Sequence, residues 1–289
     1  MKVTFHGVRG SFPVSRPEYA DYGGNTSCVE IDTGTATIII DAGTGIRRAG
    51  KELMARGVDE IHLLITHTHW DHIQGLPHFA PLQEPQVTIH LYSLAHNDHQ
   101  LQEAIAGQQE SCFFPLALAD SKASLTFTGL EDGESFAIGD TRVCCRRLNH
   151  PGVAGGYRLE QNGDAMAYIS DVDYCTDLLL GDGMATTDAA QGRRRLQELR
   201  DGVRDLAHRT GLMVFDTFFL PEDYEPDWGH SRPGDALQVG RDAEAEIIAL
   251  FHHKPHRTDA DVDALLDRYR NGAGVASLIA ARERLQLTL

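Results

Sequence analysis

The sequence predicts a single α/β domain over residues 1–289, in which two mixed β-sheets pack face to face with helices on their outer sides. Short β-rich runs dominate the first half of the chain, and helical patterns alternate with two further apolar strands in the second half. No repeat, low-complexity tract or linker rich in proline or serine separates these β-then-α halves. These observations together indicate one layered domain.

Strands are expected where apolar and β-branched residues run between turn residues. Several of these runs are apolar enough to be buried on both faces, which is typical of inner strands in α/β sheets. The expected strands cover 2–7, 27–31, 36–41, 61–66, 86–93, 124–130, 141–148, 156–160, 165–170, 212–216 and 246–251.

Three helices are expected, over 45–57, 189–208 and 259–269. The first combines apolar spacing with a closing Gly57, and the third begins at a capping box formed by Thr258 and Asp261. The second carries an arginine cluster at 192–200, which we expect to be the solvated face of the helix.

Charge narrows the range of partners. The formal net charge of −16 opposes the binding of long nucleic acids, which depends on neutralising many phosphates. Small anionic substrates that are attracted to a local positive centre remain compatible with this charge.

The expected compartment is the cytoplasm. No apolar run is long enough to span a membrane, and the N-terminal stretch lacks the pattern of a signal peptide. The five cysteines are odd in number and contain no CxxC, which indicates reduced thiols rather than disulfides.

The stretch ITHTHWDHIQG (65–75) carries the strongest chemical signal. His67, His69, Asp71 and His72 fall within six residues directly after an apolar strand. Strand ends and the loops after them are where α/β folds place their chemistry. Imidazole and carboxylate together suit Zn, Fe(II) or Mn better than Ca or Mg. A single metal rarely takes four ligands from six residues, so two metals are considered.

Further ligand candidates follow later strands. His150, Asp171 and His252 are each the first strong ligand type after the carboxyl end of a predicted strand. With the first cluster they make seven candidates, enough for two metals that share one carboxylate.

These residues also carry a family resemblance. HTHWDH matches the HxHxDH signature of the metallo-β-lactamase fold hydrolases, and the chain resembles that family over essentially its whole length. It looks closest to the phosphodiesterase-like branch, which includes cyclic-phosphate phosphodiesterases and tRNA 3′-end-processing nucleases. The shared stretches are GVRGSFP, YGGNTSCVEI, DAGTGI, HWDHIQGLP, NHPG followed by GYRLE, DWGHS and LFHHKPHRTD. The resemblance implies the four-layer αββα sandwich of that family.

The resemblance also implies how the ligands are shared, with two divalent ions, Zn first and Mn or Fe as alternatives. The implied sets are His67, His69 and His150 for one metal, and Asp71, His72 and His252 for the other, with Asp171 bridging. His253 is the rival of His252, because adjacent strand residues point to opposite sides and only one of them can face the metals. Asp41 looks like a carboxylate that orients a ligand histidine, with a turn-forming role as the alternative.

The mechanism implied by the resemblance is attack of a metal-bridging hydroxide on a phosphodiester, with Asp71 among the catalytic residues. Asp216 and His230 match an acidic residue and a histidine that together act as proton donor in the nuclease branch. This chain has Asp where the nucleases typically have Glu, so its reach is shorter. For His230, a supporting or helix-capping role is the alternative.

The leading hypothesis is therefore a dinuclear-metal phosphodiesterase that acts on a small or cyclic phosphodiester. An RNA-processing nuclease of the same branch is the alternative, but no glycine- or proline-rich arm for RNA is evident. A lactone or thioester hydrolase would not need the Asp216 and His230 pair.

Two other classes fit the sequence less well. Redox members of the fold replace the second histidine of HxHxDH, which is intact here as His69. A metal-stabilised sensor or scaffold would lack some ligands, and all are present. A membrane partner is not expected, and a homodimer is left open. His78 and His90 lie outside the matched motifs and are expected at the surface.

Overall fold

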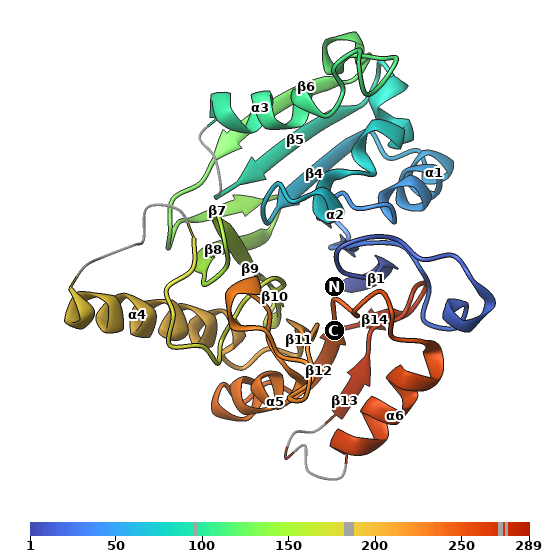
Figure 1. Cartoon of the computed structure of the whole chain (residues 1–289). Helices are drawn as coiled ribbons and strands as arrows, with labels where there is room; N and C mark the ends of the chain where they lie inside the picture. Colours follow the sequence, from blue (N-terminus) through green and yellow to red (C-terminus); the bar gives the residue numbers. More distant parts are fainter. Residues whose placement is uncertain (95–97, 182–187, 271–273, 275–276) are drawn as a thin grey trace. The chain divides into compact units, whose positions relative to one another are not determined.

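The computed structural model describes residues 1–94, 98–181, 188–270, 274 and 277–289 (Figure 1). The chain forms two compact units. Unit 1 contains Met1–Leu130, Ile138–Thr141 and Arg282–Thr288, and unit 2 contains Glu131–Ala137, Arg142–Ala281 and Leu289. Two mixed seven-stranded sheets form, as the predicted α/β class requires.

The sheet of unit 1 has the strand order β14-β1-β2-β3-β4-β5-β6. Antiparallel pairs join β14, β1, β2 and β3, and parallel pairs join β3, β4, β5 and β6. The bounds are β1 Lys2–Gly7, β2 Cys28–Asp32, β3 Thr37–Ile40, β4 Glu60–Ile65, β5 Thr88–Ser93, β6 Ser124–Gly129 and β14 Gln286–Thr288.

The second sheet has the order β13-β12-β11-β10-β9-β8-β7. Antiparallel pairs join β8, β9 and β10, and parallel pairs join β10, β11, β12 and β13. The bounds are β7 Ser135–Ile138, β8 Thr141–Leu148, β9 Ala154–Gln161, β10 Asp164–Ile169, β11 Leu212–Asp216, β12 Ile247–Phe251 and β13 Ser277–Ala280.

The α-helices are α1 Ile46–Arg56, α2 Trp70–Ile73, α3 Asp98–Gly107, α4 Ala189–Ala207, α5 Pro233–Asp242 and α6 Asp259–Arg270. Short 3-10 turns are η1 Pro17–Tyr19, η2 Leu76–His78, η3 Ala80–Gln83, η4 Leu118–Asp120 and η5 Pro226–Trp228. Among the described residues, no helix is both long enough and apolar enough to cross a lipid bilayer.

The three predicted helices, α1, α4 and α6, are confirmed. Helix α1 ends at Gly57, whose left-handed backbone (φ 71°) lets its amide N–H close the last turn. The capping box of α6 also forms, because the Thr258 amide donates to Asp261 Oδ2 at 2.8 Å and the Asp261 amide to Thr258 Oγ1 at 3.3 Å.

Six elements were not predicted: α2, α3, α5, β7, β13 and β14. The strands among them span only three or four residues, too short for an alternating pattern to stand out. The start of helix α5 does carry a sequence signal, because Pro233 occupies its first turn. The Asp235 carboxylate also accepts a hydrogen bond from the Arg232 amide at 3.0 Å.

The core of unit 1 lies between one face of its sheet and helices α1 and α3. Alternate residues of β4 and β5 pack there with α1 side chains such as Leu53, which is fully buried. Full burial of one leucine side chain stabilises a fold by about 1.5–3 kcal/mol. The opposite side chains of the same strands therefore point to the other face of the sheet.

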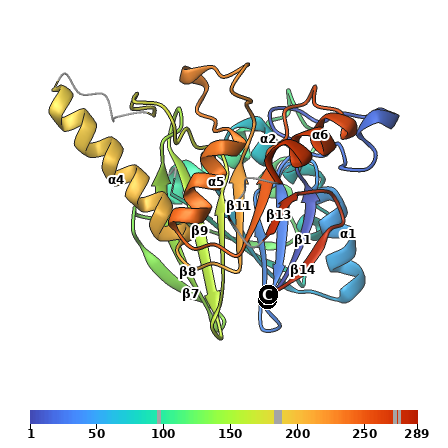
Figure 2. The same ribbon diagram turned by 90° about the horizontal axis from the view of Figure 1, so that it is seen from below.

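In unit 2, helix α4 packs on β9 and β10, and α5 packs on β11 and β12. Figure 2 shows α4 next to β9 and α5 next to β11. Leu196, Leu199 and Val203 form the buried stripe of α4. Arg193 and Arg194 are exposed, which confirms the prediction that the arginine cluster is a solvated face. The helices thus support the strands whose carboxyl ends carry the site residues.

Candidate metal centre

The predicted ligands divide between the two units. His67, His69, Asp71 and His72 follow β4 in unit 1 and are called the unit 1 cluster. The unit 2 cluster consists of five residues after β8, at the ends of β10, β11 and β12, and before α5: His150, Asp171, Asp216, His230 and His252.

The side chains of the unit 1 cluster converge. The imidazole centroid of His67 lies 4.4 Å from that of His69 and 4.3 Å from that of His72. Asp71 Oδ2 lies 3.4 Å from His72 Nε2. The backbone stays extended through His69 and then begins α2, so the ligand candidates straddle the strand-to-helix turn.

Asp41 and Thr66 orient these histidines from the ends of β3 and β4. Asp41 Oδ2 lies 2.8 Å from His72 Nδ1, so Nε2 is the nitrogen that faces Asp71. Asp41 Oδ1 accepts from the Thr66 amide at 2.9 Å, and Thr66 Oγ1 lies 3.1 Å from His67 Nδ1. The parallel pairing of β3 and β4 brings these strand ends together. Sequence reasoning missed Thr66, although its place between the strand and the first histidine was a signal.

Two conspicuous motifs, GVRGSFP and DAGTGI, hold Asp71. The amide of Ser11 donates to Asp71 Oδ2 at 2.7 Å, with Ser11 in the left-handed region at φ 61°. Gly43 passes so close that a Cβ there would lie 2.4 Å from the Asp71 carbonyl oxygen. Only glycine fits at this approach, so the loop supports the ligand through its backbone.

In the unit 2 cluster, Asp171 lies between two histidines. Asp171 Oδ1 is 3.2 Å from His252 Nε2, and Asp171 Oδ2 is 3.8 Å from His150 Nε2. Each carboxylate oxygen therefore faces a different imidazole, an arrangement compatible with the predicted bridging role of Asp171. Both Asp171 and His252 have left-handed backbones, at φ 58° and 60°.

Gly229 sets the orientation of His150. Its carbonyl oxygen lies 2.9 Å from His150 Nδ1, so that nitrogen carries the hydrogen and Nε2 is left to bind a metal. A Cβ on Gly229 would lie 2.4 Å from His150 Nδ1 and 2.3 Å from Pro151 Cδ. The sequence motif DWGHS thus contains a supporting residue that sequence reasoning had not singled out.

Asp216 and His230 form the pair predicted to donate a proton. His230 Nδ1 lies 2.7 Å from Asp216 Oδ2. The ring of Phe218 stacks on the His230 imidazole, with centroids 4.6 Å apart and planes inclined by 25°. The Phe218 amide donates to Asp216 Oδ1 at 2.9 Å. Asp216 Oδ1 is 3.9 Å from His252 Nδ1, which is too long for a hydrogen bond.

His253, the rival of His252, and Asp173, a carboxylate two residues after Asp171, both have structural partners. His253 Nε2 lies 2.8 Å from the carbonyl oxygen of Ala281, which directs it away from Asp171. Asp173 accepts hydrogen bonds from Tyr224 Oη at 2.6 Å and from the Thr176 amide at 2.9 Å. Burial raises the pKa of the Asp173 carboxyl against the effect of these donors. Burial likewise raises the pKa of the neighbouring Cys175 thiol to about 12, so this sulfur is a neutral thiol.

The donor chemistry of both clusters fits divalent metal ions. Imidazole nitrogens and carboxylate oxygens converge, and hydrogen bonds to Nδ1 direct Nε2 of His72 and of His150 toward the cluster. In unit 2, ligand atoms of Asp171, Asp216, His230 and His252 all lie within 4.8 Å of one another.

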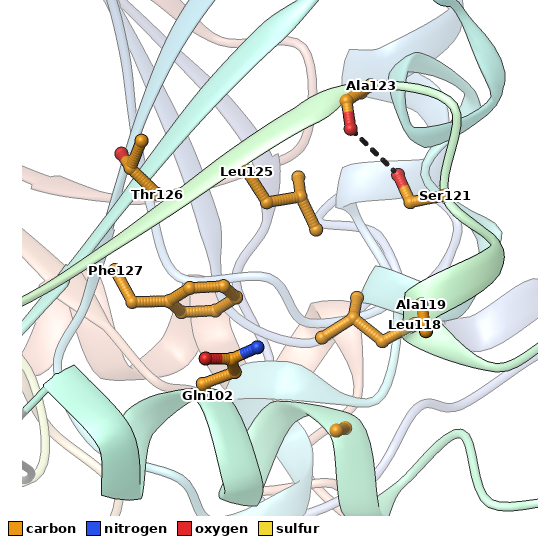
Figure 3. Close-up of a pocket in the computed structure, with 9 residues that line it drawn as sticks. Gln102, Leu118, Ala119, Ser121, Ala123, Leu125, Thr126 and Phe127 are labelled. Atoms are coloured by element: carbon orange, nitrogen blue, oxygen red, sulfur yellow. Dashed lines mark hydrogen bonds between the residues drawn. The ribbon is translucent and has the colours of Figure 1, made fainter.

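A pocket in unit 1 lies elsewhere, between α3 and β6 (Figure 3). Its volume is about 580 Å³, and Leu118, Leu125 and Phe127 form its apolar lining. Neither the ligand candidates nor the proton-donor pair line it, so this pocket is not part of the predicted metal centre.

Comparison with known proteins identifies the family. The beta-lactamase superfamily domain matches residues 36–253, and the chain belongs to this family. It is 28% identical over 274 residues to ribonuclease Z of Streptomyces coelicolor, covering 85% of this chain and 86% of the relative.

Solved structures show the same fold at low sequence identity. The metallo-beta-lactamase fold protein YhfI from Bacillus subtilis aligns with a TM-score of 0.69 and 14% identity, covering 99% of this chain and 98% of YhfI. A diphosphatase from the PhnP family aligns with a TM-score of 0.67 and 16% identity, covering 100% of this chain and 97% of that protein. The predicted metallo-β-lactamase type of αββα fold is confirmed, and the chain is a metal-dependent hydrolase.

Proposed function

We propose that the two clusters contribute to one dinuclear centre and that the two units work as a single domain. One divalent ion would be held by His67, His69 and His150, the other by Asp71, His72 and His252, with Asp171 between them. The conformation within each cluster and the family membership of the chain support this assignment. Zn is the favoured metal because imidazole dominates the donor set, with Mn or Fe as alternatives.

The proposed reaction is hydrolysis of a phosphodiester. Two bound divalent ions would lower the pKa of a shared water toward ~7 and polarise a substrate oxygen. The observation that carries the proposal is the buried Asp216–His230 pair, at 2.7 Å, beside the bridging carboxylate candidate. An alkoxide leaves slowly unless it is protonated, and such a pair can supply the proton.

The proton path follows from the hydrogen bond. Because Asp216 accepts at His230 Nδ1, the other ring nitrogen, Nε2, is left to hold and release a proton. As hydroxide, the form of the water that has already lost one proton, bonds to phosphorus, the phosphorus–oxygen bond to the leaving group would break, and protonated His230 would give its Nε2 proton to the departing oxygen. Asp71, as ligand and candidate catalytic residue, would keep the attacking water in place.

The proposed substrate is a small or cyclic phosphodiester, because the net charge of −16 opposes long polyanions. Arginines of α4 and β8 do not offset this charge: Arg195 pairs with Glu198 at 2.9 Å and Arg146 with Asp205 at 3.1 Å. A tRNA-processing nuclease is the second candidate, since the Streptomyces relative that spans most of the chain is a ribonuclease Z.

We also propose that the protein works in a reducing compartment such as the cytoplasm. The five cysteines all lie in the described part of the chain, and none of them forms a disulfide. Light scattering on the purified protein would show whether it forms the homodimer that the sequence leaves open.

The first test compares three substrates: bis(p-nitrophenyl) phosphate, p-nitrophenyl phosphate, and a precursor tRNA with a 3′ trailer. The protein is assayed metal-free and after reloading with Zn or Mn, with His69→Ala as the inactive variant and His78→Ala as the matched control. We expect metal-dependent turnover of the diester and not of the monoester. Absence of diester turnover by a chain that holds about two metals would overturn the phosphodiesterase. Faster cleavage of the precursor tRNA would instead favour the nuclease.

His230→Gln separates a proton donor from a supporting residue. With a poor alkoxide leaving group, as in a cyclic nucleotide, we expect kcat to fall by roughly 10²–10⁴. With bis(p-nitrophenyl) phosphate the loss should be much smaller, because p-nitrophenolate leaves without a proton. Equal losses on both substrates, or a loss of bound metal, would contradict the assignment.

A further inference from the structure

A second group of ligand-type side chains lies in unit 1, on β4 and β5. Glu60 and His62 are two residues apart on β4, so they point to the same face of the sheet. His90 on β5 is the register partner of His62. His62 is three residues, about 10 Å, before the carboxyl end of β4, and the unit 1 cluster begins beyond that end, at His67.

Both imidazoles direct one nitrogen at a single carboxylate oxygen. His90 Nε2 lies 3.2 Å from Glu60 Oε1, and His62 Nε2 lies 3.8 Å from the same atom. The two rings are stacked, with centroids 4.9 Å apart and planes inclined by 20°. Their three donor atoms all lie within 4.8 Å of one another.

The other nitrogen of each ring meets a hydroxyl group. His62 Nδ1 lies 3.2 Å from Tyr92 Oη, and His90 Nδ1 lies 2.8 Å from Thr126 Oγ1. Metal-binding histidines are commonly held this way, since a partner at one nitrogen fixes the ring and leaves the other nitrogen to the metal.

The electrostatics favour the neutral form of the His62 imidazole. Burial lowers the pKa of His62, the adjacent His90 lowers it further, and Glu60 partly opposes these effects. Neutral imidazole is the form that binds a metal. Two protonated rings stacked at this distance would repel each other, whereas one cation between them and Glu60 would be attracted to all three.

Another histidine–carboxylate group in unit 1 differs because arginine side chains contact it. His6 Nε2 lies 2.8 Å from Glu30 Oε2, but Arg48 Nε donates to His6 Nδ1 at 3.3 Å and Arg56 donates to Glu30 Oε1 at 2.6 Å. Guanidinium groups thus provide the positive charge there, and a metal has no role. Within the described chain, Glu60 pairs with His62 and His90 and forms no ion pair with an arginine or a lysine.

We propose that Glu60, His62 and His90 bind one borderline divalent cation, such as Zn, Ni or Cu, at a site separate from the proposed dinuclear centre. The cation joins β4 to β5 through side chains on one face of the sheet. Glu60 is 64% exposed and His90 25%, so an ion from solvent reaches the site without unfolding of the strands. The proposal does not depend on the reaction catalysed at the dinuclear centre.

The test counts bound ions in the full chain. Metal-free protein is equilibrated with Ni or Zn, and the bound metal per chain is measured by mass spectrometry and by calorimetric titration. We expect the double variant His62→Gln/His90→Gln to bind one ion fewer than the unchanged chain. Glu60→Gln should retain the site with an affinity reduced at least ~10-fold.

Matched controls and a spectroscopic readout complete the test. His78→Gln and His208→Gln remove exposed histidines elsewhere and should leave the ion count unchanged. Bound Cu should show hyperfine coupling to two imidazole nitrogens at this site by electron paramagnetic resonance, and this signal should vanish in the double variant. If the double variant fails to fold, as judged by circular dichroism, the metal affinity of Glu60→Gln alone tests the site. Equal ion counts and affinities in the unchanged chain and in a folded variant would overturn the site.

Discussion

Three of the candidate site residues have a backbone conformation that side chains rarely adopt. Asp41, Asp171 and His252 lie at φ 62°, 58° and 60°, each just beyond a strand end. A non-glycine residue in this region costs of order 1–3 kcal/mol, so the surrounding structure must enforce it. This conformation orients the side chain, because the backbone turns abruptly after the strand and presents the side chain at the edge of the sheet.

The adjacent residues His252 and His253 offer a matched test at the scale of single residues. His252→Gln should reduce the metal bound at the centre, since His252 Nε2 faces Asp171 at 3.2 Å. His253→Gln should keep the metal and lower the free energy of unfolding by about 1 kcal/mol, because it weakens one hydrogen bond to Ala281. Metal analysis and urea unfolding of both variants check this, and loss of metal in the His253 variant alone would reverse the assignment.

At the scale of elements, the turn that follows η5 supports a ligand from a neighbouring loop. Gly229 has φ 80° and almost touches His150 and Pro151. We expect Gly229→Ala to lose most of its diester turnover and part of its metal, because the added methyl group must displace His150. Activity and metal content are measured together.

Gly163→Ala is the control for that substitution. Gly163 has a similar φ of 93°, but a Cβ there would meet nothing within 4 Å. Both variants share the cost of a left-handed alanine, of order 1 kcal/mol, so any additional loss in Gly229→Ala reports the clash. Equal effects of the two substitutions would show that Gly229 does not position His150.

Strands β1 and β2 and helix α1 are joined by a buried charge network that makes stability depend on pH. Burial of Glu30 opposes its ionisation, but hydrogen bonds from His6 and Arg56 outweigh it and lower the pKa of the carboxyl. Glu30 therefore stabilises the fold above the ordinary glutamate pKa of about 4.3, and this contribution disappears as pH falls through the lowered value.

Glu30→Gln should accordingly destabilise the protein by roughly 1–3 kcal/mol at pH 7. The difference from the unchanged chain should shrink in acid, as pH falls through the lowered pKa of the Glu30 carboxyl. Urea unfolding at pH 7 and across the acid range measures this. Glu244→Gln serves as control, because the Glu244–Arg209 pair is exposed and should contribute little at any pH. A difference that persists in acid would exclude the proposed network.

At the scale of the whole molecule, metal should stabilise both units together if they share one centre. Free metal at a thousand times its Kd adds about 4 kcal/mol to the free energy of unfolding. Each kcal/mol corresponds to roughly 2–4 °C in Tm for a chain of this size class. We therefore expect chelation to lower Tm by several degrees and reloading to restore it.

The shape of the unfolding curve tests the single-domain proposal. With metal bound, the chain should unfold in one calorimetric transition, because both units contribute ligands. After chelation the two units are free to unfold in separate steps. Two separate transitions in the metal-loaded protein, or a Tm unaffected by chelation, would count against a shared centre.

Much of the molecule was predictable because its signals are local. HTHWDH places four ligand candidates in six consecutive residues, and His150, Asp171 and His252 each follow an apolar strand. Helices α1, α4 and α6 have apolar stripes and end signals within their own residues, whereas β14, with three residues, has none. Local periodicity is thus enough to predict long elements and the positions of chemistry at their ends.

The tertiary structure decided which side chains meet. That Gly229 holds His150, that Asp41 holds His72, and that His253 reaches Ala281 depends on contacts between residues 28–79 positions apart. The pairing of His62 with His90 depends on the register of β4 against β5, since His90 had been expected to be an ordinary surface residue. Register and loop approach are set by packing of the whole core, which no local pattern encodes. The sequence by itself therefore determined the family and its ligand types, and the fold determined how each of them is oriented.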